Sequence, residues 1–376
     1  MCRLIALTSE EPLSPMIALR ALDVMREGHD GSGVGLLLRD LAGPFEKMKD
    51  APILSGIFSE NGLKRLDRFM MDVGFMTKYR MSFKPPKTPP PGVPRRDVYL
   101  VRAYEYPEEW ENLSTNELCS RLLILRLELQ KMGEEKKDMI VFSFWPDTIM
   151  IKEIGEPLEL AEHLNINRME LGARVIMAQG RQNTNYEINL YACHPFFIQG
   201  FSTMTNGENT AFVPIREYLM SRGFQGYTGY QSDSEVFTHI LHYTVLQLGL
   251  SIEAYKHVIT PLQDEDLKNH PDYQFLKQLK HSCRKLITDG PNCVIGCLPD
   301  NSLFMAQDRK KLRPGVVGGR EGLFCFCSEI CGLDAAIPDR DKSTDFQPMH
   351  LDTAIVGPDR KEVAICCQTQ QLPRPH

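Results

Sequence analysis

The chain opens with Met1-Cys2-Arg3-Leu4-Ile5-Ala6-Leu7, and the position of Cys2 directly after the initiator methionine is its most informative feature. Cysteine is small enough for that methionine to be trimmed, which would leave one residue with both a thiol and a free α-amine. A thiol with a pKa of about 8.5 is only partly ionised at neutral pH, and an α-amine with a pKa of about 7.7–8.0 can accept its proton. Nucleophile and base then belong to one residue. The weak alternation of residues 2–7 predicts a first strand that ends at this group.

The composition is that of an ordinary folded protein. A length of 376 residues favours roughly two domains, and the hydrophobic fraction of 42% is typical of globular chains. The net charge of −6 argues against nucleic acid or an anionic membrane as the main partner. No apolar run reaches the roughly 18 residues that span a bilayer. Because Glu10, Glu11 and Pro12 also interrupt the apolar start too early for a signal peptide, we expect a cytoplasmic protein.

Eleven cysteines raise the question of a metal site. Without a secretory signal, reduced thiols are expected in preference to disulfides. Cys325, Cys327 and Cys331 lie close together, but metal and cluster sites usually contain C-x2-C pairs. The alternation of Cys325-Phe326-Cys327 indicates buried thiols on a strand, with zinc or an iron–sulfur cluster as the alternative. We therefore expect no metal and no cofactor in this chain.

A proline-rich stretch interrupts the pattern of strands and helices. Residues 78–96 contain six prolines among six basic residues. Such a segment cannot bury a core and favours extended polyproline geometry. We interpret residues 84–94, called here the proline-rich strap, as a solvated linker or an interface element in preference to a nucleic-acid patch.

A compact α/β pattern follows the strap. Residues 98–104 predict a strand, and Ser114-Thr115-Asn116-Glu117 is a capping box that opens a helix through Met132. Residues 139–145 and 148–154 predict a hairpin. We therefore predict an inserted α/β subdomain over residues 85–160, with the strap as its lead-in, which interrupts one domain spanning residues 2–376.

Outside this insertion, four stretches gather residues suited to amide chemistry. An Arg fork binds the α-carboxylate of an amino acid, and a carboxylate binds its α-ammonium. An Asn-Gly pair can present a side-chain amide and a backbone N–H to one oxyanion, because glycine admits close backbone approach. With a thiol nucleophile, these are the parts of a glutamine hydrolase. The stretches are Cys2; Arg26-Glu27-Gly28-His29-Asp30-Gly31-Ser32-Gly33; Gly180-Arg181-Gln182-Asn183-Thr184, with His194-Pro195-Phe196 and Thr205-Asn206-Gly207-Glu208-Asn209 after it; and Ser232-Asp233-Ser234-Glu235.

Each part alone has a simpler interpretation. Arg181 would form a surface ion pair, and Asn206-Gly207 would be a plain turn. Asp233 would cap the helix that we expect from Ser232-Asp233 to Gly249. The joint order of the motifs carries the functional argument.

That order resembles the class II (N-terminal nucleophile) glutamine amidotransferases, and specifically the amidotransferase part of glutamate synthases. The resemblance covers residues 2–40 and about 165–365, including Leu312-Arg313-Pro314 and Ser328-Glu329-Ile330-Cys331-Gly332-Leu333-Asp334. Three positions depart from the family pattern: Gln179 and Thr205 each replace a histidine, and Glu27 separates the usual Arg-Gly pair. The departures leave the pocket packing and the role of Arg26 open.

The resemblance implies an α+β fold, a four-layer αββα N-terminal nucleophile hydrolase sandwich. It implies that Cys2 attacks the glutamine amide while its own α-amine moves the proton, and that Asn206 and the Gly207 N–H stabilise the oxyanion. Arg181 and Asp233 would hold the two ends of the substrate. Thr184 and Arg26 complete the implied substrate-binding residues.

The resemblance also implies a partner. Free ammonia is wasted unless it is channelled, so a separate synthase subunit in a hetero-oligomer is expected, glutamate synthase-like and bearing FMN and iron–sulfur clusters. Gly223–Gly229 has the glycines for a loop that closes on the site, although a plain surface turn is the simpler interpretation of this segment. Two alternatives remain open: a stand-alone N-terminal nucleophile amidohydrolase that acts on another amide, and a non-catalytic glutamine-sensing subunit.

Overall fold

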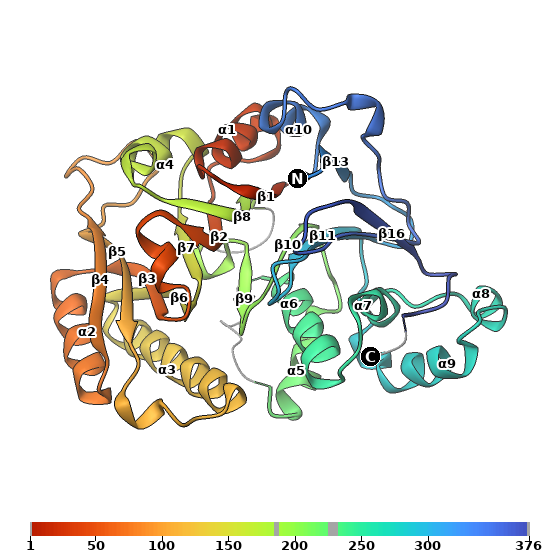
Figure 1. Ribbon diagram of the computed structural model, residues 1–376, viewed down its shortest axis with the longest axis horizontal. Helices are drawn as coiled ribbons and strands as arrows, with labels where there is room; N and C mark the ends of the chain where they lie inside the picture. The colour runs from red at the N-terminus through yellow and green to blue at the C-terminus, as the bar shows by residue number, and fades with distance from the viewer. Residues whose placement is uncertain (1, 184–187, 225–231, 374–376) are drawn as a thin grey trace.

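The computed structural model describes residues 2–183, 188–224 and 232–373, and two antiparallel sheets form its centre (Figure 1). The first has six strands in the order β13 (Val316–Arg320), β14 (Leu323–Cys327), β1 (Arg3–Leu13), β8 (Gly172–Gly180), β2 (Val34–Ala42) and β7 (Thr148–Glu153). The second has six in the order β16 (Val363–Cys367), β15 (Asp352–Val356), β12 (Leu303–Gln307), β11 (Asn292–Cys297), β10 (Phe201–Gly207) and β9 (Phe196–Ile198). The predicted N-terminal strand is confirmed as β1, which lies inside the first sheet.

The two sheets share one apolar core. Fully buried side chains from both fill the space between them, among them Ala6, Met177, Met204, Ile295 and Met305. On the outer side of the first sheet lie α1 (Met16–Val24), α4 (Pro157–His163) and α10 (Ile330–Ala336) (Figure 1). Beside the second sheet lie α5 (Phe212–Ser221), α6 (Glu235–His242), α7 (Ile252–Ile259), α8 (Asp264–Lys268) and α9 (Tyr273–Ser282). The expected α+β class and the four-layer αββα sandwich are confirmed.

A third sheet lies at the side of the sandwich (Figure 1). Its four strands follow the order β4 (Met76–Phe83), β5 (Val98–Glu105), β3 (Pro52–Phe58) and β6 (Met139–Pro146). The helices α2 (Glu60–Val73) and α3 (Thr115–Lys136) pack on it around a separate core that includes Leu54, Phe58 and Phe144. The capping box is confirmed: Ser114 Oγ accepts a hydrogen bond from the Glu117 N–H, and the Glu117 carboxylate accepts one from the Ser114 N–H.

The bounds of this third sheet differ from those predicted for the insertion. It begins with β3, well before residue 85, because β3 is one of its two interior strands and pairs with both β5 and β6. The predicted hairpin is wrong: β6 pairs with β3, whereas β7 pairs with β2 of the first sheet. Asp147, with a φ of 48°, turns the chain from one sheet into the other. The proline-rich strap connects β4 to β5 without regular secondary structure.

Two further sequence interpretations are refined. The helix expected to run to Gly249 is α6, which ends at His242 and is followed by one π-helical turn, Tyr243–Gln247. Cys325 and Cys327 are fully buried on β14, and Cys331 is exposed. Within residues 2–183, 188–224 and 232–373, no cluster of three or more His, Cys, Asp or Glu side chains is arranged to hold a metal ion.

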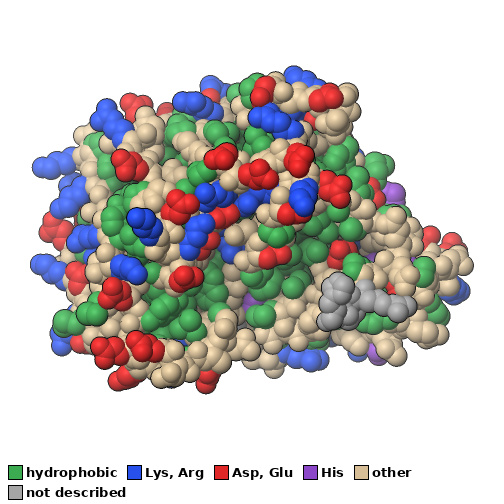
Figure 2. Space-filling model, viewed as in Figure 1, with side chains coloured by type: hydrophobic (Ala, Val, Ile, Leu, Met, Phe, Trp, Pro, Cys, Tyr) green, Lys and Arg blue, Asp and Glu red, His purple; other side chains and the backbone are tan. Residues whose placement is uncertain are grey.

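The surface has mixed charge. On the face shown in Figure 2, acidic and basic side chains are interspersed and form no extended patch of one sign. In the part of the chain that the structure describes, every helix is too short or too polar to cross a membrane.

Candidate active site

Most of the residues selected from the sequence meet in one pocket of about 160 Å³ at the N-terminal end of β1. Cys2, Arg181, Gly207 and Asp233 all line it, although they come from four distant segments of the chain. The remaining lining is mostly polar: Gln182, Asn183, His194, Thr205, Glu208, Asn209, Thr210, Phe212, Ser232 and Ser234. Both central sheets therefore contribute to the pocket.

The antiparallel pairing of β1 with β8 brings the thiol to this pocket. Arg3 pairs with Gly180, so Cys2 lies beside the residues that follow β8. Its Sγ accepts a hydrogen bond from the Gln182 N–H at 3.4 Å. Burial raises the pKa of the Cys2 thiol, although the Gln182 hydrogen bond and the positive charge of Arg181 act in the opposite direction. The thiol is therefore protonated at neutral pH and needs a base to become a nucleophile.

Arg181 is 6% exposed, and one of its guanidinium nitrogens has no hydrogen-bond partner among the described residues. Its backbone is held by the Asp30–Gly33 motif: its N–H donates to the Gly33 carbonyl at 2.8 Å, and its carbonyl accepts from the Ser32 hydroxyl at 3.3 Å. Its Nη2 donates to Asn183 Oδ1 at 3.2 Å, and Nη1 is buried without a partner among the described residues. Because an unpaired buried guanidinium is costly, the site is suited to an anion. The surface ion-pair interpretation does not fit this burial.

Asp233 also faces the pocket and does not cap the helix. The helix α6 begins only at Glu235, and Asp233 Oδ2 accepts a hydrogen bond from the Asn209 N–H at 2.6 Å. Its Oδ1 accepts from the Ser234 hydroxyl at 3.2 Å. Burial raises the pKa of the Asp233 carboxyl, and the Asn209 hydrogen bond partly offsets this effect. No basic side chain of the described chain forms an ion pair with it, so a cationic substrate group would supply the missing charge.

Asn206 and Gly207 end the strand β10 and do not form a hairpin turn. They pair with Cys293 and Asn292 of β11. Asn206 is 1% exposed, and its Nδ2 has no hydrogen-bond partner within the described ranges. Gly207 has a φ of 155°, and a Cβ atom there would lie 2.0 Å from the Pro291 carbonyl oxygen, so only glycine fits. The pair thus has the free amide donor that an oxyanion site requires.

Three predicted residues are not among those that line this pocket: Asn206, which is buried beside Gly207, Arg26 and Thr184. Arg26 lies in the single 3₁₀ turn Arg26–Gly28, where its side chain is 67% exposed and forms an ion pair with Asp23 at 2.8 Å. It is not among the residues that line the pocket, because its side chain extends to solvent beside α1. Thr184 lies outside the described residues, as does most of the predicted loop Gly223–Gly229.

His194 and Asn209 are site residues to which the sequence analysis gave no role. Both belong to motifs that were recognised, but neither side chain had an evident chemical partner. His194 Nδ1 accepts a hydrogen bond from the Thr205 N–H at 3.0 Å, and Asn209 orients Asp233 through its backbone. Burial, reinforced by Arg181 and Lys152, lowers the pKa of His194 well below its ordinary value. The imidazole is therefore neutral and able to accept through Nδ1.

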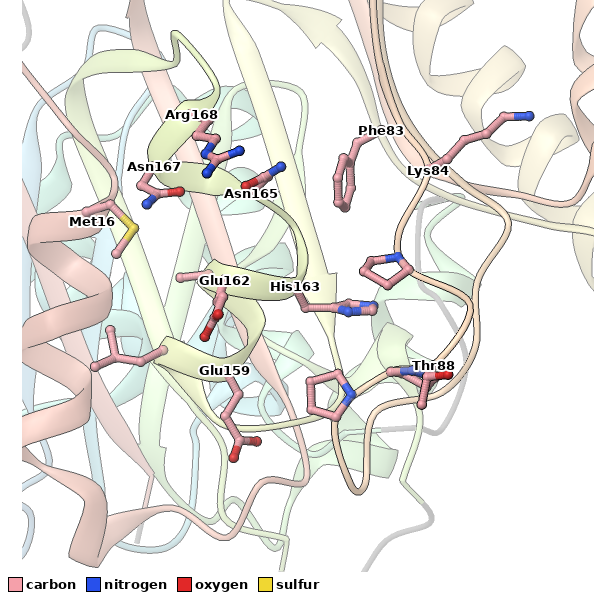
Figure 3. Close-up of a pocket in the computed structure, with 15 residues that line it drawn as sticks. Met16, Phe83, Lys84, Thr88, Glu159, Glu162, His163, Asn165, Asn167 and Arg168 are labelled. Atoms are coloured by element: carbon pink, nitrogen blue, oxygen red, sulfur yellow. The ribbon is translucent and has the colours of Figure 1, made fainter.

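A larger hollow, of about 1020 Å³, lies between the proline-rich strap and α4. Figure 3 shows the side chain of His163 extending from α4 towards the strap, which contributes Lys84 and Thr88 to the lining. None of the proposed catalytic residues lines this hollow. Its size alone does not make it the reaction site, because chemistry requires convergent reactive groups.

No family model matches the chain. It is similar to a protein of uncharacterised function from Archaeoglobus fulgidus, with 24% identity over 217 residues, covering 57% of this chain and 56% of that protein. A protein from Methanothermobacter thermautotrophicus, provisionally named a glutamine amidotransferase, is 27% identical over 199 residues, covering 52% of this chain and 55% of the relative. Glutamine–fructose-6-phosphate aminotransferase (isomerizing) from Yersinia pseudotuberculosis is 25% identical over 188 residues, covering 50% of this chain and 29% of that enzyme.

Solved structures show weaker similarity. Glutamine phosphoribosylpyrophosphate amidotransferase from B. subtilis, complexed with ADP and GMP, superposes with a TM-score of 0.47 at 12% identity, covering 99% of this chain and 50% of that one. This TM-score is too low to assign the fold. We assign the fold from the order and pairing of the strands in the two central sheets. The chain spans about half the length of the first two curated relatives.

Proposed function

We propose that this chain is a class II glutamine amidotransferase that hydrolyses glutamine to glutamate and ammonia with Cys2 as nucleophile. The observation that supports it most directly is the convergence of Cys2, Arg181, Asp233 and Gly207 on one small pocket, with Asn206 directly before Gly207 on β10. Arg181 and Asn206 each keep a buried N–H donor without a partner among the described residues. These two donors match the carboxylate of an amino acid and the oxyanion of its attacked side-chain amide.

The first half of the reaction uses groups of one residue. After removal of Met1, the α-amine of Cys2 takes the thiol proton, and Sγ attacks the side-chain amide carbon of glutamine. Asn206 Nδ2 and the Gly207 N–H stabilise the resulting oxyanion. The C–N bond then breaks, the ammonium of Cys2 returns a proton to the leaving nitrogen, and ammonia departs from a glutamyl thioester.

The second half regenerates the thiol. Water, deprotonated by the same α-amine, attacks the thioester carbonyl, and the same donors stabilise the second oxyanion. The C–S bond breaks, the thiolate recovers a proton, and glutamate leaves. Arg181 and Asp233 hold the α-carboxylate and α-ammonium throughout, so they bind groups whose charge does not change.

We further propose that the ammonia passes to a separate synthase subunit, glutamate synthase-like, which would carry the FMN and iron–sulfur clusters. This step rests on the order of the motifs and on the need to channel ammonia. A glutaminase assay with glutamine, asparagine and simple amides as substrates tests the proposal. Hydrolysis of another amide in preference to glutamine would favour the stand-alone amidohydrolase, and glutamine binding without turnover would favour a sensing subunit.

The substrate clamp leads to a kinetic prediction. Arg181→Lys and Asp233→Asn should each raise the KM for glutamine by a larger factor than they lower kcat, because both residues contribute uniform binding. Lysine keeps the charge of Arg181 but loses its two-pronged donor geometry. Steady-state kinetics of the two variants provide the measurement. Arg168→Lys, in the larger hollow, is the matched control, and wild-type KM values in both clamp variants would contradict the assignment.

The proline-rich strap is our candidate for the contact with the synthase. Removing all of residues 85–160 would be a poor test, because this range includes β7, which pairs with β2, and Lys152, whose Nζ donates to the Cys193 carbonyl. Replacing only residues 85–91 with a glycine-serine segment of equal length keeps the buried Val93 in place. We expect weaker copurification with the synthase and unchanged labelling of Cys2. Lost labelling with intact complex formation would instead assign the strap to the active site.

A further inference from the structure

The strand that carries Asn206 and Gly207 loses its neighbour just before these residues. β9 pairs with β10 only from Phe201 to Thr203, opposite Ile198 to Phe196. Along this strand His194 is the next residue whose backbone groups would face β10, because alternate residues face opposite edges. The same register would place His194 opposite Thr205, but no backbone pairing is formed there. The edge of β10 beside Thr205 therefore needs other hydrogen-bond partners.

The side chain of Gln179 occupies the place of this missing pairing. Its Oε1 accepts a hydrogen bond from the His194 N–H at 3.1 Å, and its Nε2 donates to the Thr205 carbonyl at 3.3 Å. The His194 ring completes the arrangement, since its Nδ1 accepts from the Thr205 N–H at 3.0 Å. Both backbone groups of Thr205 are thus held by side chains.

Gln179 also connects this strand to the sheet of the nucleophile. It belongs to β8, where it pairs with Leu4 of β1 and with Gly35 of β2. Its side chain is 1% exposed and crosses to the second sheet. Because backbone groups alternate along a strand, the Gly207 N–H points to the same open edge of β10 as the Thr205 N–H that His194 accepts. Displacement of Thr205 would therefore move both oxyanion donors.

We propose that Gln179, with His194, is a positioning residue that aligns the Asn206-Gly207 strand with Cys2 for oxyanion stabilisation. The proposal rests on the glutaminase function proposed above. An uncharged amide suits the position because it offers one donor and one acceptor at once. An ionised glutamate has no donor, methionine has neither function, and histidine has one of each.

The test compares three substitutions in the full chain together with its synthase. Gln179→Met keeps the approximate volume and removes both hydrogen bonds, so kcat should fall by about 10- to 100-fold while the KM for glutamine changes little. Loss of a direct oxyanion donor, at about 10²–10³ in kcat, is the upper limit for a residue that acts through Asn206. Gln179→Glu should be at least as impaired, and Gln179→His should recover most of kcat. The matched control is Gln368→Met, another buried glutamine whose Nε2 donates to a threonine carbonyl, that of Thr260.

A double-mutant cycle separates positioning from general stability. If Gln179 acts through the oxyanion donors, Gln179→Met should have little further effect on kcat in an Asn206→Ala background. Additive effects, a change confined to KM or a lowered Tm with unchanged kcat would each overturn the proposal. A wild-type chain without glutaminase activity or Cys2 labelling would instead overturn the proposed function itself. The two failures are distinguishable, because the second is seen in the wild-type chain without any variant.

Discussion

Replacement of Cys2 by alanine is expected to reduce glutamine hydrolysis below detection while leaving the fold and glutamine binding intact. The substitution removes the attacking atom, and no other described thiol lines the pocket. Cys2 is half-buried at the end of β1, so the loss of one sulfur atom costs little packing. Assays of glutamate release and of glutamine binding on the same preparation would show whether hydrolysis is lost while binding is retained. Unchanged turnover in Cys2→Ala would exclude the mechanism.

The same nucleophile should be visible chemically. A glutamine-like diazoketone should label Cys2 alone among the eleven cysteines. Cys293, Cys325 and Cys327 are fully buried, and burial raises their pKa values, so they should not react. Cys331 is exposed and lies outside the pocket, which makes Cys331→Ala the matched control. Mass analysis should find that active protein begins at Cys2, and retention of Met1 on active enzyme would contradict the role of the α-amine.

Replacement of Asn206 by alanine should have the second largest effect. Its buried Nδ2 is unpaired among the described residues, so the free enzyme loses no hydrogen bond when it is removed. The transition state would lose one oxyanion donor, worth about 2.7–4 kcal/mol or 10²–10³ in kcat. The KM for glutamine should change little, because the donor is used mainly after attack has begun.

Asn292→Ala is the control for this prediction. Asn292 is 2% exposed on the neighbouring strand β11, and its Nδ2 already donates to the Gly290 carbonyl at 3.2 Å. The Asn292→Ala substitution should lower Tm without a loss of kcat comparable to that of Asn206→Ala. An Asn206→Ala enzyme with wild-type kcat would mean that the oxyanion lies elsewhere. A large increase in KM alone would make Asn206 a substrate-binding residue.

Local sequence signals were sufficient for several parts of the molecule. The capping box at Ser114 and the strand at the N-terminus depend on neighbouring residues, and both are confirmed. The order of short motifs also selected Cys2, Arg181, Gly207 and Asp233, which share one pocket. The chemical role of each of these residues could be inferred from its residue type and motif alone, without its position in the fold. Arg26 was selected in the same way, but its exposed ion pair with Asp23 depends on the 3₁₀ turn that it occupies.

The sequence by itself determined the residue types of the proposed chemistry and the strand that presents Cys2, because these depend on a residue and its immediate neighbours. Only the tertiary structure decided the bounds of the third sheet, the separation of β6 from β7 and the role of Gln179. Each of these depends on which distant strands pair, and periodicity cannot reveal a strand's partner. Gln179 shows the reason most clearly, since its two hydrogen-bond partners lie 15 and 26 residues away and exist only where two sheets meet.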